Sequence, residues 1–134
     1  MIDVDYLRGV NDAYGHDAGD EVLRRIAATL TGHLRRTDVI ARYDAEQFCV
    51  IAVNAGETSL DTFERLRQEI AGLEIRHAGH TIRVTVSIGF TRQLGESLAD
   101  TLRHAEALVQ KAKRDGRDRV VADGAAEQHG MEAS

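Results

Sequence analysis

The sequence predicts a single α+β domain, with a central, mainly antiparallel sheet of about five strands and helices packed on its faces. Two observations predict this class. Three segments repeat apolar residues at helical spacing, and the shorter apolar segments between them have the length and composition of strands. Counting one short helical turn, the order is strand, two helices, two strands, helix, two strands, helix and strand. Hairpins that alternate with helices in this way favour an antiparallel sheet covered by helices.

The first strand is predicted at the N-terminus, where apolar residues alternate with two acids, Asp3 and Asp5. Alternation puts the apolar residues on a core face and both acids on the other face. A polar segment with room for one short helical turn follows. A helix of four to five turns then ends near Arg36. Its apolar positions recur at helical spacing: Val22, Leu23, Ile26, Ala27, Leu30 and Leu34.

A hairpin follows this helix, with strands expected near residues 38–43 and 47–53. The second helix begins near Thr58, which can cap its N-terminus together with Asp61. The apolar face of this helix is predicted to contain Leu60, Phe63, Leu66, Ile70 and Leu73. A second hairpin is then expected around the turn at Ala78-Gly79.

The third helix is predicted to begin at Ser97 and to end in a basic segment before Gly116, a natural helix C-cap. A short segment, RVVA, can form a closing edge strand. The resulting order is typical of ferredoxin-like domains. We therefore expect one domain over residues 1–122 and a disordered tail over residues 123–134.

Composition excludes several classes of protein. The chain has 134 residues, of which 43% are hydrophobic, enough to fill one core. Its net charge of −5 argues against a nucleic-acid partner. No apolar run approaches the roughly 20 residues of a membrane span, and no signal peptide is evident. We expect a cytoplasmic domain without direct membrane contact, in which Cys49 is a buried structural thiol.

The tip of the first hairpin, Asp44-Ala45-Glu46-Gln47, carries two acids and an amide but no glycine. A tight hairpin turn favours left-handed backbone angles, which glycine adopts most easily. The tip therefore indicates a functional site, or a site that has been altered. If their strands are neighbours, Asp3 and Glu46 can reach one edge of the sheet and form a Mg²⁺ site with a strand-end carbonyl. The alternative is two solvated acids near turns.

Other polar residues suit a nucleotide. Arg8, Lys113 and Arg117 are candidate phosphate anchors, and Asn11 with Asp20 can hydrogen-bond a nucleobase edge. Ordinary helix capping by cations and acids is the alternative for each of them.

Four segments together resemble a GGDEF domain, the diguanylate cyclase family: IDVDYLRGVNDAYGHDAGDEVLRRIA, RRTDVIARYDAEQF, VTVSIGF and AEALVQKAKRDGRDRV. The similarity covers residues 2–121, in order and with the spacing of the family. It implies a fold like that of nucleotide-cyclase catalytic domains, GTP as substrate and cyclic di-GMP, a bacterial second messenger, as product. It also implies a homodimer, in a parent protein with sensory or phosphodiesterase domains and a possible membrane attachment.

The resemblance also assigns residues. It implies a Mg²⁺ site at Asp3, the carbonyl of Val4, and Glu46. It implies a GTP site made of Arg8, Asn11, Asp20, Lys113 and Arg117. Arg8 stands where the family usually has lysine, which keeps the charge but changes the shape of the group.

The five-residue family signature falls on Asp44-Ala45-Glu46-Gln47-Phe48, and both of its glycines are replaced. The Cβ atoms of Asp44 and Ala45, which replace these glycines, would crowd the ribose and α-phosphate of GTP. The negative charge of Asp44 would also repel the phosphates. Gln47 cannot accept a proton, and its neutrality weakens the Mg²⁺ site. We therefore expect a degenerate active site with no intact catalytic residue.

Residues 35–38 match the RxxD product site of the family through Arg35 and Asp38, and Arg65 matches an arginine that completes it. Guanidinium groups suit guanine O6/N7 and phosphate, and a carboxylate accepts from guanine N–H groups. The expected function is a non-catalytic sensor of cyclic di-GMP. A GTP-binding module that controls a neighbouring domain, a weak or active cyclase of the nucleotidyltransferase class, and a structural dimerisation domain are the alternatives.

Overall fold

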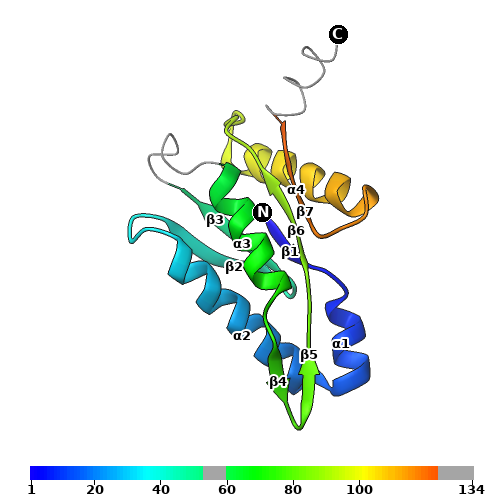
Figure 1. Ribbon diagram of the computed structural model, residues 1–134. Helices are drawn as coiled ribbons and strands as arrows, with labels where there is room; N and C mark the ends of the chain where they lie inside the picture. Colours follow the sequence, from blue (N-terminus) through cyan, green and yellow to red (C-terminus); the bar gives the residue numbers. More distant parts are fainter. Residues whose placement is uncertain (53–59, 124–134) are drawn as a thin grey trace.

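A five-stranded sheet with the strand order β2-β3-β1-β6-β7 forms the centre of the computed structural model, which describes residues 1–52 and 60–123 (Figure 1). The elements are β1 (Ile2–Val4), α1 (Leu7–Tyr14), α2 (His16–His33), β2 (Val39–Asp44), β3 (Gln47–Ile51), α3 (Leu60–Ala71), β4 (Ile75–His77), β5 (His80–Ile82), β6 (Val86–Phe90), α4 (Leu98–Arg114) and β7 (Arg119–Ala122). The pairs within this sheet are antiparallel except β6–β7, which is parallel. The predicted α+β class is confirmed.

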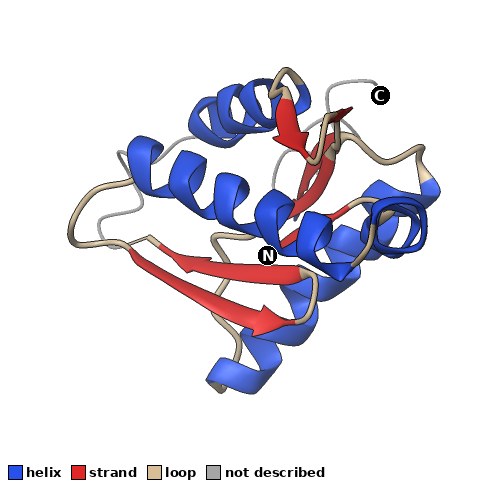
Figure 2. Cartoon of the chain, turned by 90° about the horizontal axis from the view of Figure 1, so that it is seen from below, coloured by secondary structure: helices blue, strands red, loops and turns tan. Residues whose placement is uncertain are grey.

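Helices cover both faces of this sheet (Figures 1 and 2). The larger core forms where α1, α2 and α3 pack on one face, because the apolar stripes predicted for α2 and α3 point toward the same strands. Its main residues are Ile2, Val4, Val22, Ile26, Leu30, Phe48, Phe63, Leu66, Ile70, Val86 and Ile88. A smaller cluster, with Met1, Ala105 and Val109, lies between the sheet and α4.

Gly89 on β6 determines how closely α4 approaches the sheet. A Cβ atom at this position would lie 2.3 Å from the carbonyl oxygen of Ala105 and 2.8 Å from the backbone nitrogen of Val109. Real Cβ contacts do not become this short, so the close packing requires glycine. As a result, the C-terminal half of α4 is held against the face of the sheet that carries Asp3.

The alternation predicted for β1 is confirmed on its apolar side, since Ile2 and Val4 are in the larger core. The two acids of this segment, Asp3 and Asp5, are also buried, with 2% and 3% of their surface exposed. They are buried because α4 and the α4–β7 connection cover the second face. The sequence pattern predicted the face of each acid but not this cover.

Several element boundaries differ from the prediction. The expected single helical turn is the eight-residue helix α1, and α2 ends at His33 rather than near Arg36 because Leu34 adopts an extended conformation. The second hairpin is also different: β4 and β5 form a separate two-stranded sheet, and β6 joins the central sheet instead (Figure 1).

Some predictions lie outside the described residues, namely the cap at Thr58 and the tail from residue 124 onward. The division into one domain and a tail therefore stays a prediction. In residues 1–52 and 60–123, no helix combines the length and apolarity needed to cross a bilayer.

Candidate functional site

The candidate site begins at Asp3, in the middle of the sheet. Asp3 pairs with Gln47 across the β1–β3 ladder, which places both side chains on the face covered by α4. Asp3 Oδ2 accepts a hydrogen bond of 3.1 Å from Gln47 Nε2 and forms a 2.8 Å ion pair with Lys113 Nζ. Three elements distant in the sequence therefore meet at one carboxylate oxygen.

Gln47 extends this contact to a second acid. Its Nε2 also donates to Glu106 Oε2 at 2.7 Å, so one amide group bridges two carboxylates. Gln110 Nε2 donates to the other oxygen of Glu106 at 2.9 Å. We call Asp3, Gln47, Glu106 and Lys113 the β1 network.

The pKa of the Asp3 carboxyl group is raised by some of its surroundings and lowered by others. Burial raises the pKa of its carboxyl group, and the negative charge of Glu106 raises it further. The hydrogen bonds from Lys113 and Gln47, together with the charge of Lys113, lower the pKa but do not cancel the effect of burial. Asp3 Oδ1 is buried and has no hydrogen-bond partner among the described residues.

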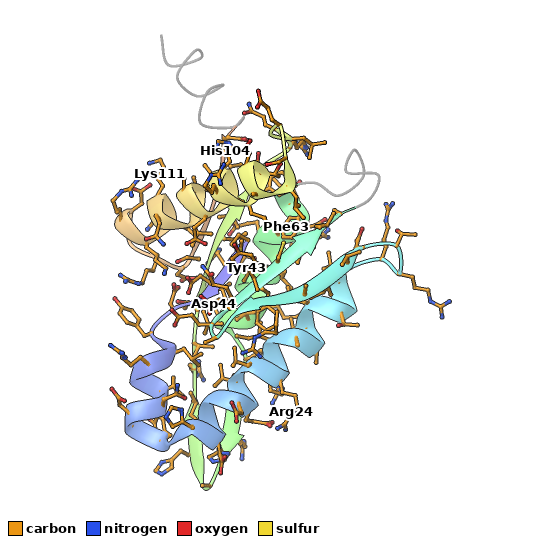
Figure 3. All side chains as sticks on the ribbon, turned by 180° about the vertical axis from the view of Figure 1, so that it is seen from behind. Arg24, Tyr43, Asp44, Phe63, His104 and Lys111 are labelled. Carbon is orange, nitrogen blue, oxygen red and sulfur yellow. The ribbon has the colours of Figure 1, made fainter. Side chains whose placement is uncertain are left out.

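The hairpin tip (residues 44–47) lies beside β1 and is held by its own side chains (Figure 3). Arg42 donates from Nη2 to the carbonyl of Ala45 at 2.8 Å and from Nε to the carbonyl of Asp44 at 3.2 Å. Asp44 Oδ1 accepts from the backbone N–H of Ala45 at 2.8 Å. The ladder shifts register between Arg42 and Asp44, and neither Ala45 nor Glu46 has a positive φ. This irregularity allows the tip to turn without glycine.

Glu46 was predicted to join Asp3 in a Mg²⁺ site. The underlying expectation that their strands are neighbours is confirmed, and the Glu46 carbonyl accepts from the backbone N–H of Val4 at 3.0 Å. The side chain that reaches Asp3, however, is Gln47, which presents a donor. In the part of the chain that the structure describes, no three His, Cys, Asp or Glu side chains are grouped to hold a metal ion. The residues as arranged do not fit Mg²⁺, and the assignment stays a prediction.

Asp5, the second acid of the first strand, supports the neighbouring turn. Its carboxylate accepts from Thr85 Oγ1 at 2.6 Å, from Ser87 Oγ at 2.7 Å and from the backbone N–H of Asp118 at 3.1 Å. A carboxylate with three donors is satisfied without a ligand. Asp5 therefore has a structural role, anchoring the segment that follows α4.

That segment positions Arg117, one of the predicted phosphate anchors. Arg117 and Asp118 both have left-handed backbone angles, with φ of 64° and 50°. The guanidinium carbon of Arg117 lies 4.5 Å from the ring centroid of Tyr6, within the range of a cation–π contact. Lys113, the other predicted anchor on this side, is engaged with Asp3 instead.

The predicted guanine-recognition pair lies at the junction of α1 and α2. A Cβ atom at Gly19 would lie 1.9 Å from Asn11 Oδ1, so the Asn11 side chain occupies the space that this glycine leaves. Asp20 is the next residue of α2 and is exposed. Arg8 is exposed on the first turn of α1. The structure thus places Asn11 against Gly19, the residue before Asp20, on helices that follow directly from β1.

The RxxD segment forms a turn between α2 and β2, which we call the corner (residues 35–38). The backbone N–H of Arg35 donates to Asp38 Oδ2 at 2.9 Å, and the N–H of Asp38 donates to the carbonyl of Arg35 at 3.0 Å. Arg65 is exposed on α3, one helical turn before Glu69. Glu69 pairs with His33, at the end of α2, at 3.1 Å. Arg65 therefore lies on the side of α3 that faces the end of α2.

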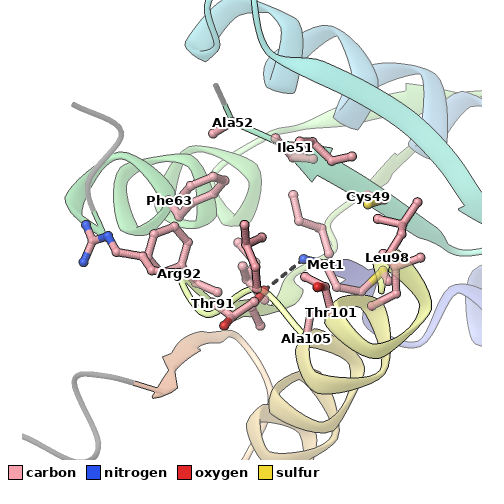
Figure 4. A pocket seen from close by; sticks show the side chains of 17 residues that line it. Met1, Cys49, Ile51, Ala52, Phe63, Thr91, Arg92, Leu98, Thr101 and Ala105 are labelled. Carbon is pink, nitrogen blue, oxygen red and sulfur yellow. Dashed lines mark hydrogen bonds between the residues drawn. The ribbon is translucent and has the colours of Figure 1, made fainter. Parts of the chain in front are cut away.

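An apolar cavity of about 270 Å³ lies elsewhere, between α4, α3 and the ends of β3 and β6 (Figure 4). Its walls include Cys49, Ile51, Phe63, Leu98 and Ala105. Cys49 was predicted to be a buried structural thiol. It is half-buried instead, because it faces this cavity.

Glu106 and Gln110 were not predicted to be site residues. A signal was nevertheless present, since Glu106 and Gln110 stand at helical spacing from Lys113 and share one face of α4 with it. Only the docking of α4 on the sheet shows that this face lies over Asp3 and Gln47.

Comparison with known proteins agrees with this fold. The family described as "Diguanylate cyclase, GGDEF domain" matches residues 1–119. The chain is 38% identical to the response regulator PleD of Caulobacter vibrioides, over 90% of this chain and 28% of PleD. It is 35% identical to diguanylate cyclase A of Treponema denticola, over 90% of this chain and 33% of that protein. The chain thus spans a third or less of the length of these curated relatives.

Two solved structures are also similar. Diguanylate cyclase SiaD from Pseudomonas aeruginosa, in complex with its activator SiaC, has a TM-score of 0.83 and 35% identity over 91% of this chain and 48% of SiaD. The GGDEF domain of DgcB from Caulobacter crescentus, in complex with c-di-GMP, has a TM-score of 0.77 and 32% identity over 90% of this chain and 74% of that domain. The chain therefore belongs to the diguanylate cyclase GGDEF family and is a domain of cyclic di-GMP signalling.

Proposed function

We propose that this chain is a non-catalytic GGDEF domain that binds cyclic di-GMP at the corner, through Arg35, Asp38 and Arg65. The observation that carries the proposal is the geometry of the corner. The Asp38 carboxylate is oriented by the backbone N–H of Arg35, while the Arg35 and Arg65 side chains are exposed at the end of α2 and on α3. Arg35 and Asp38 thus lie at one surface turn, and Arg65 lies on the side of α3 that faces the end of α2.

This set of groups matches the chemistry of the ligand. Cyclic di-GMP carries two phosphates and two guanines, so arginines can address phosphate or guanine O6/N7 while a carboxylate accepts from guanine N–H groups. A charge-assisted hydrogen bond contributes roughly 1.5–3 kcal/mol. The DgcB domain, crystallised with c-di-GMP, supports the proposal as a related domain that binds this molecule.

The residues of the tip support the proposal that the domain is not catalytic. A general base near an attacking hydroxyl must accept a proton, and the Gln47 amide cannot do so. Here Gln47 donates to two acids, and Asp44 adds a negative charge where a triphosphate would lie. Diguanylate cyclases of this family generally use Mg²⁺, and the β1 network presents donors where such an ion would need oxygen ligands.

Titration calorimetry with cyclic di-GMP tests the proposal. The native protein should bind saturably, and Arg35→Ala and Asp38→Ala should each weaken binding by about ten- to a hundred-fold, the effect of one charge-assisted contact. Arg36→Ala is the matched control, since Arg36 is an adjacent exposed arginine outside the Arg35–Asp38 pair. Equal affinities in all four proteins would contradict the proposed site.

A second candidate is a GTP-binding module that regulates a neighbouring domain. Asn11 lies against Gly19 beside Asp20, and Arg117 is held over Tyr6, so the chain keeps residues suited to guanine and phosphate. The curated relatives are longer than this chain, which is consistent with flanking sensory or phosphodiesterase domains. GTP binding without turnover, in the presence of Mg²⁺, would favour this candidate.

A further inference from the structure

The β1 network contains a cation supplied by the chain itself. Lys113 Nζ and Gln47 Nε2 both contact Asp3 Oδ2, at 2.8 Å and 3.1 Å. We propose that these two groups take the place of a divalent cation at Asp3, so that the central strand keeps its buried acid paired without a metal ion. The proposal goes beyond the binding of cyclic di-GMP and does not depend on it.

The charges of the network support this inference. Asp3 is 2% exposed, and a buried carboxylate that lacks a partner is strongly unfavourable. Lys113, whose side chain is 22% exposed, supplies the positive charge at hydrogen-bond distance. The sheet and α4 therefore pack around an ion pair formed by the protein alone.

Gln47 is essential to the arrangement because an amide NH₂ has two donor hydrogens. It donates to Asp3 and to Glu106, and so holds the two acids apart without adding charge. A glutamate at this position would place a third carboxylate there, with no donor. Three carboxylates around one point are the oxygen ligands that a hard divalent cation prefers.

One atom of the network remains available. Asp3 Oδ1 is buried and has no hydrogen-bond partner among the described residues. If Lys113 were removed, Oδ1 would still have no partner and Oδ2 would keep only the neutral Gln47 donor, so that Asp3 could bind an ion. Lys113 and a divalent cation should therefore compete for the same carboxylate.

Calorimetry with Mn²⁺ alone, without nucleotide, tests this competition. Lys113→Met should bind Mn²⁺ about tenfold or more tightly than the native protein, the change expected from releasing one charge-assisted contact. Lys111→Met is the matched control, because Lys111 lies on the same helix but pairs with exposed Asp115 at 2.9 Å. This control should bind Mn²⁺ no better than the native protein.

Gln47→Glu is a second, independent variant, and keeps the test decisive if Lys113→Met does not fold. It should also gain Mn²⁺ affinity and a higher unfolding temperature in Mn²⁺. Only binding that Asp3→Asn abolishes counts as binding at this site. The proposal is overturned if the native protein binds Mn²⁺ at Asp3 as tightly as the variants, or if neither Lys113→Met nor Gln47→Glu gains affinity.

Discussion

The tip and the corner carry the same kinds of side chain but use them differently. At the tip, Arg42 donates to the carbonyls of Asp44 and Ala45, and Gln47 donates to Asp3. At the corner, the Asp38 carboxylate is bound by the main chain of Arg35, and the Arg35 side chain is exposed. Both turns thus contain an aspartate that accepts from a backbone N–H. They differ in that the tip contacts the buried acid Asp3 through Gln47, whereas the corner lies at an exposed turn.

If the tip is inactive and the corner binds cyclic di-GMP, as proposed above, this difference explains how one site of the fold can change without the other. Replacing the two signature glycines changes a turn that the sheet can still accommodate, because the irregularity between Arg42 and Asp44 takes up the strain.

The largest expected effect concerns catalysis. Loss of a general base alone costs about 10²–10⁴-fold in rate, so the purified protein with GTP and Mg²⁺ should form no cyclic di-GMP detectable by chromatography. The triple change Asp44→Gly, Ala45→Gly and Gln47→Glu should restore some activity. Gln47→Glu alone should not, since the side chains at positions 44 and 45 remain. Rapid turnover by the native protein would refute this view of the tip.

The second prediction separates the two nucleotides. Asn11→Ala and Asp20→Ala should each weaken GTP binding by about tenfold or more and leave cyclic di-GMP binding unchanged, as measured by calorimetry. The reason is that these residues lie at the α1–α2 junction, away from the corner. If cyclic di-GMP binding survives Arg35→Ala and disappears in Asn11→Ala, the product binds near the tip and the comparison fails.

The third prediction concerns pH and the β1 network. Removing Lys113 raises the pKa of Asp3 further above its usual value, because burial and Glu106 then act with less opposition. A carboxyl group whose folded-state pKa is raised loses stability as the pH rises from its unfolded value, about 3.9, through its folded value. The deficit of Lys113→Met in urea unfolding should therefore grow from pH 4 to pH 7, to about 1.5 kcal/mol or more. A deficit independent of pH would indicate lost packing instead.

The smallest effect is expected from Gly19→Ala. The new Cβ atom would displace the end of the flexible Asn11 side chain, and the higher helix propensity of alanine, about 1 kcal/mol, should offset the cost. Stability should change little while GTP affinity falls as in Asn11→Ala. Gly32→Ala is the control, because a Cβ there meets nothing within 4 Å. Gly32→Ala should leave GTP binding unchanged and raise the stability by about 1 kcal/mol, because no contact offsets its gain in helix propensity.

Much of the fold follows from local patterns. Helical spacing located α2, α3 and α4, and the N-cap at Ser97 is confirmed, since its side chain accepts from the backbone N–H of Asp100. The small hairpin β4–β5 was predicted from the same apolar alternation as β6. The alternation of apolar residues did not show whether β5 and β6 form one strand. Alternation indicates which face of a strand is buried, but not which neighbouring strand it pairs with.

The site was predictable to a similar extent. The positions of Asp3, Lys113 and Gln47 were each identified, and the proximity of β1 to β3 was expected. The bond between Gln47 and Glu106 joins residues 59 positions apart, and no local spacing encodes such a pair. The role of Arg42 at the tip likewise depends on a bulge that the sequence does not signal.

By itself, the sequence determined the class of the fold, the family, the altered signature and the apolar faces, because periodicity and motifs are local properties of the chain. The tertiary structure decided which charges meet. Gly89 lets α4 approach β6 closely, and this approach places Lys113 and Glu106 over Asp3 and Gln47. Whether an acid is solvated, paired or able to bind a metal depends on these long-range contacts, since burial and neighbouring charge, rather than residue type, set its energy.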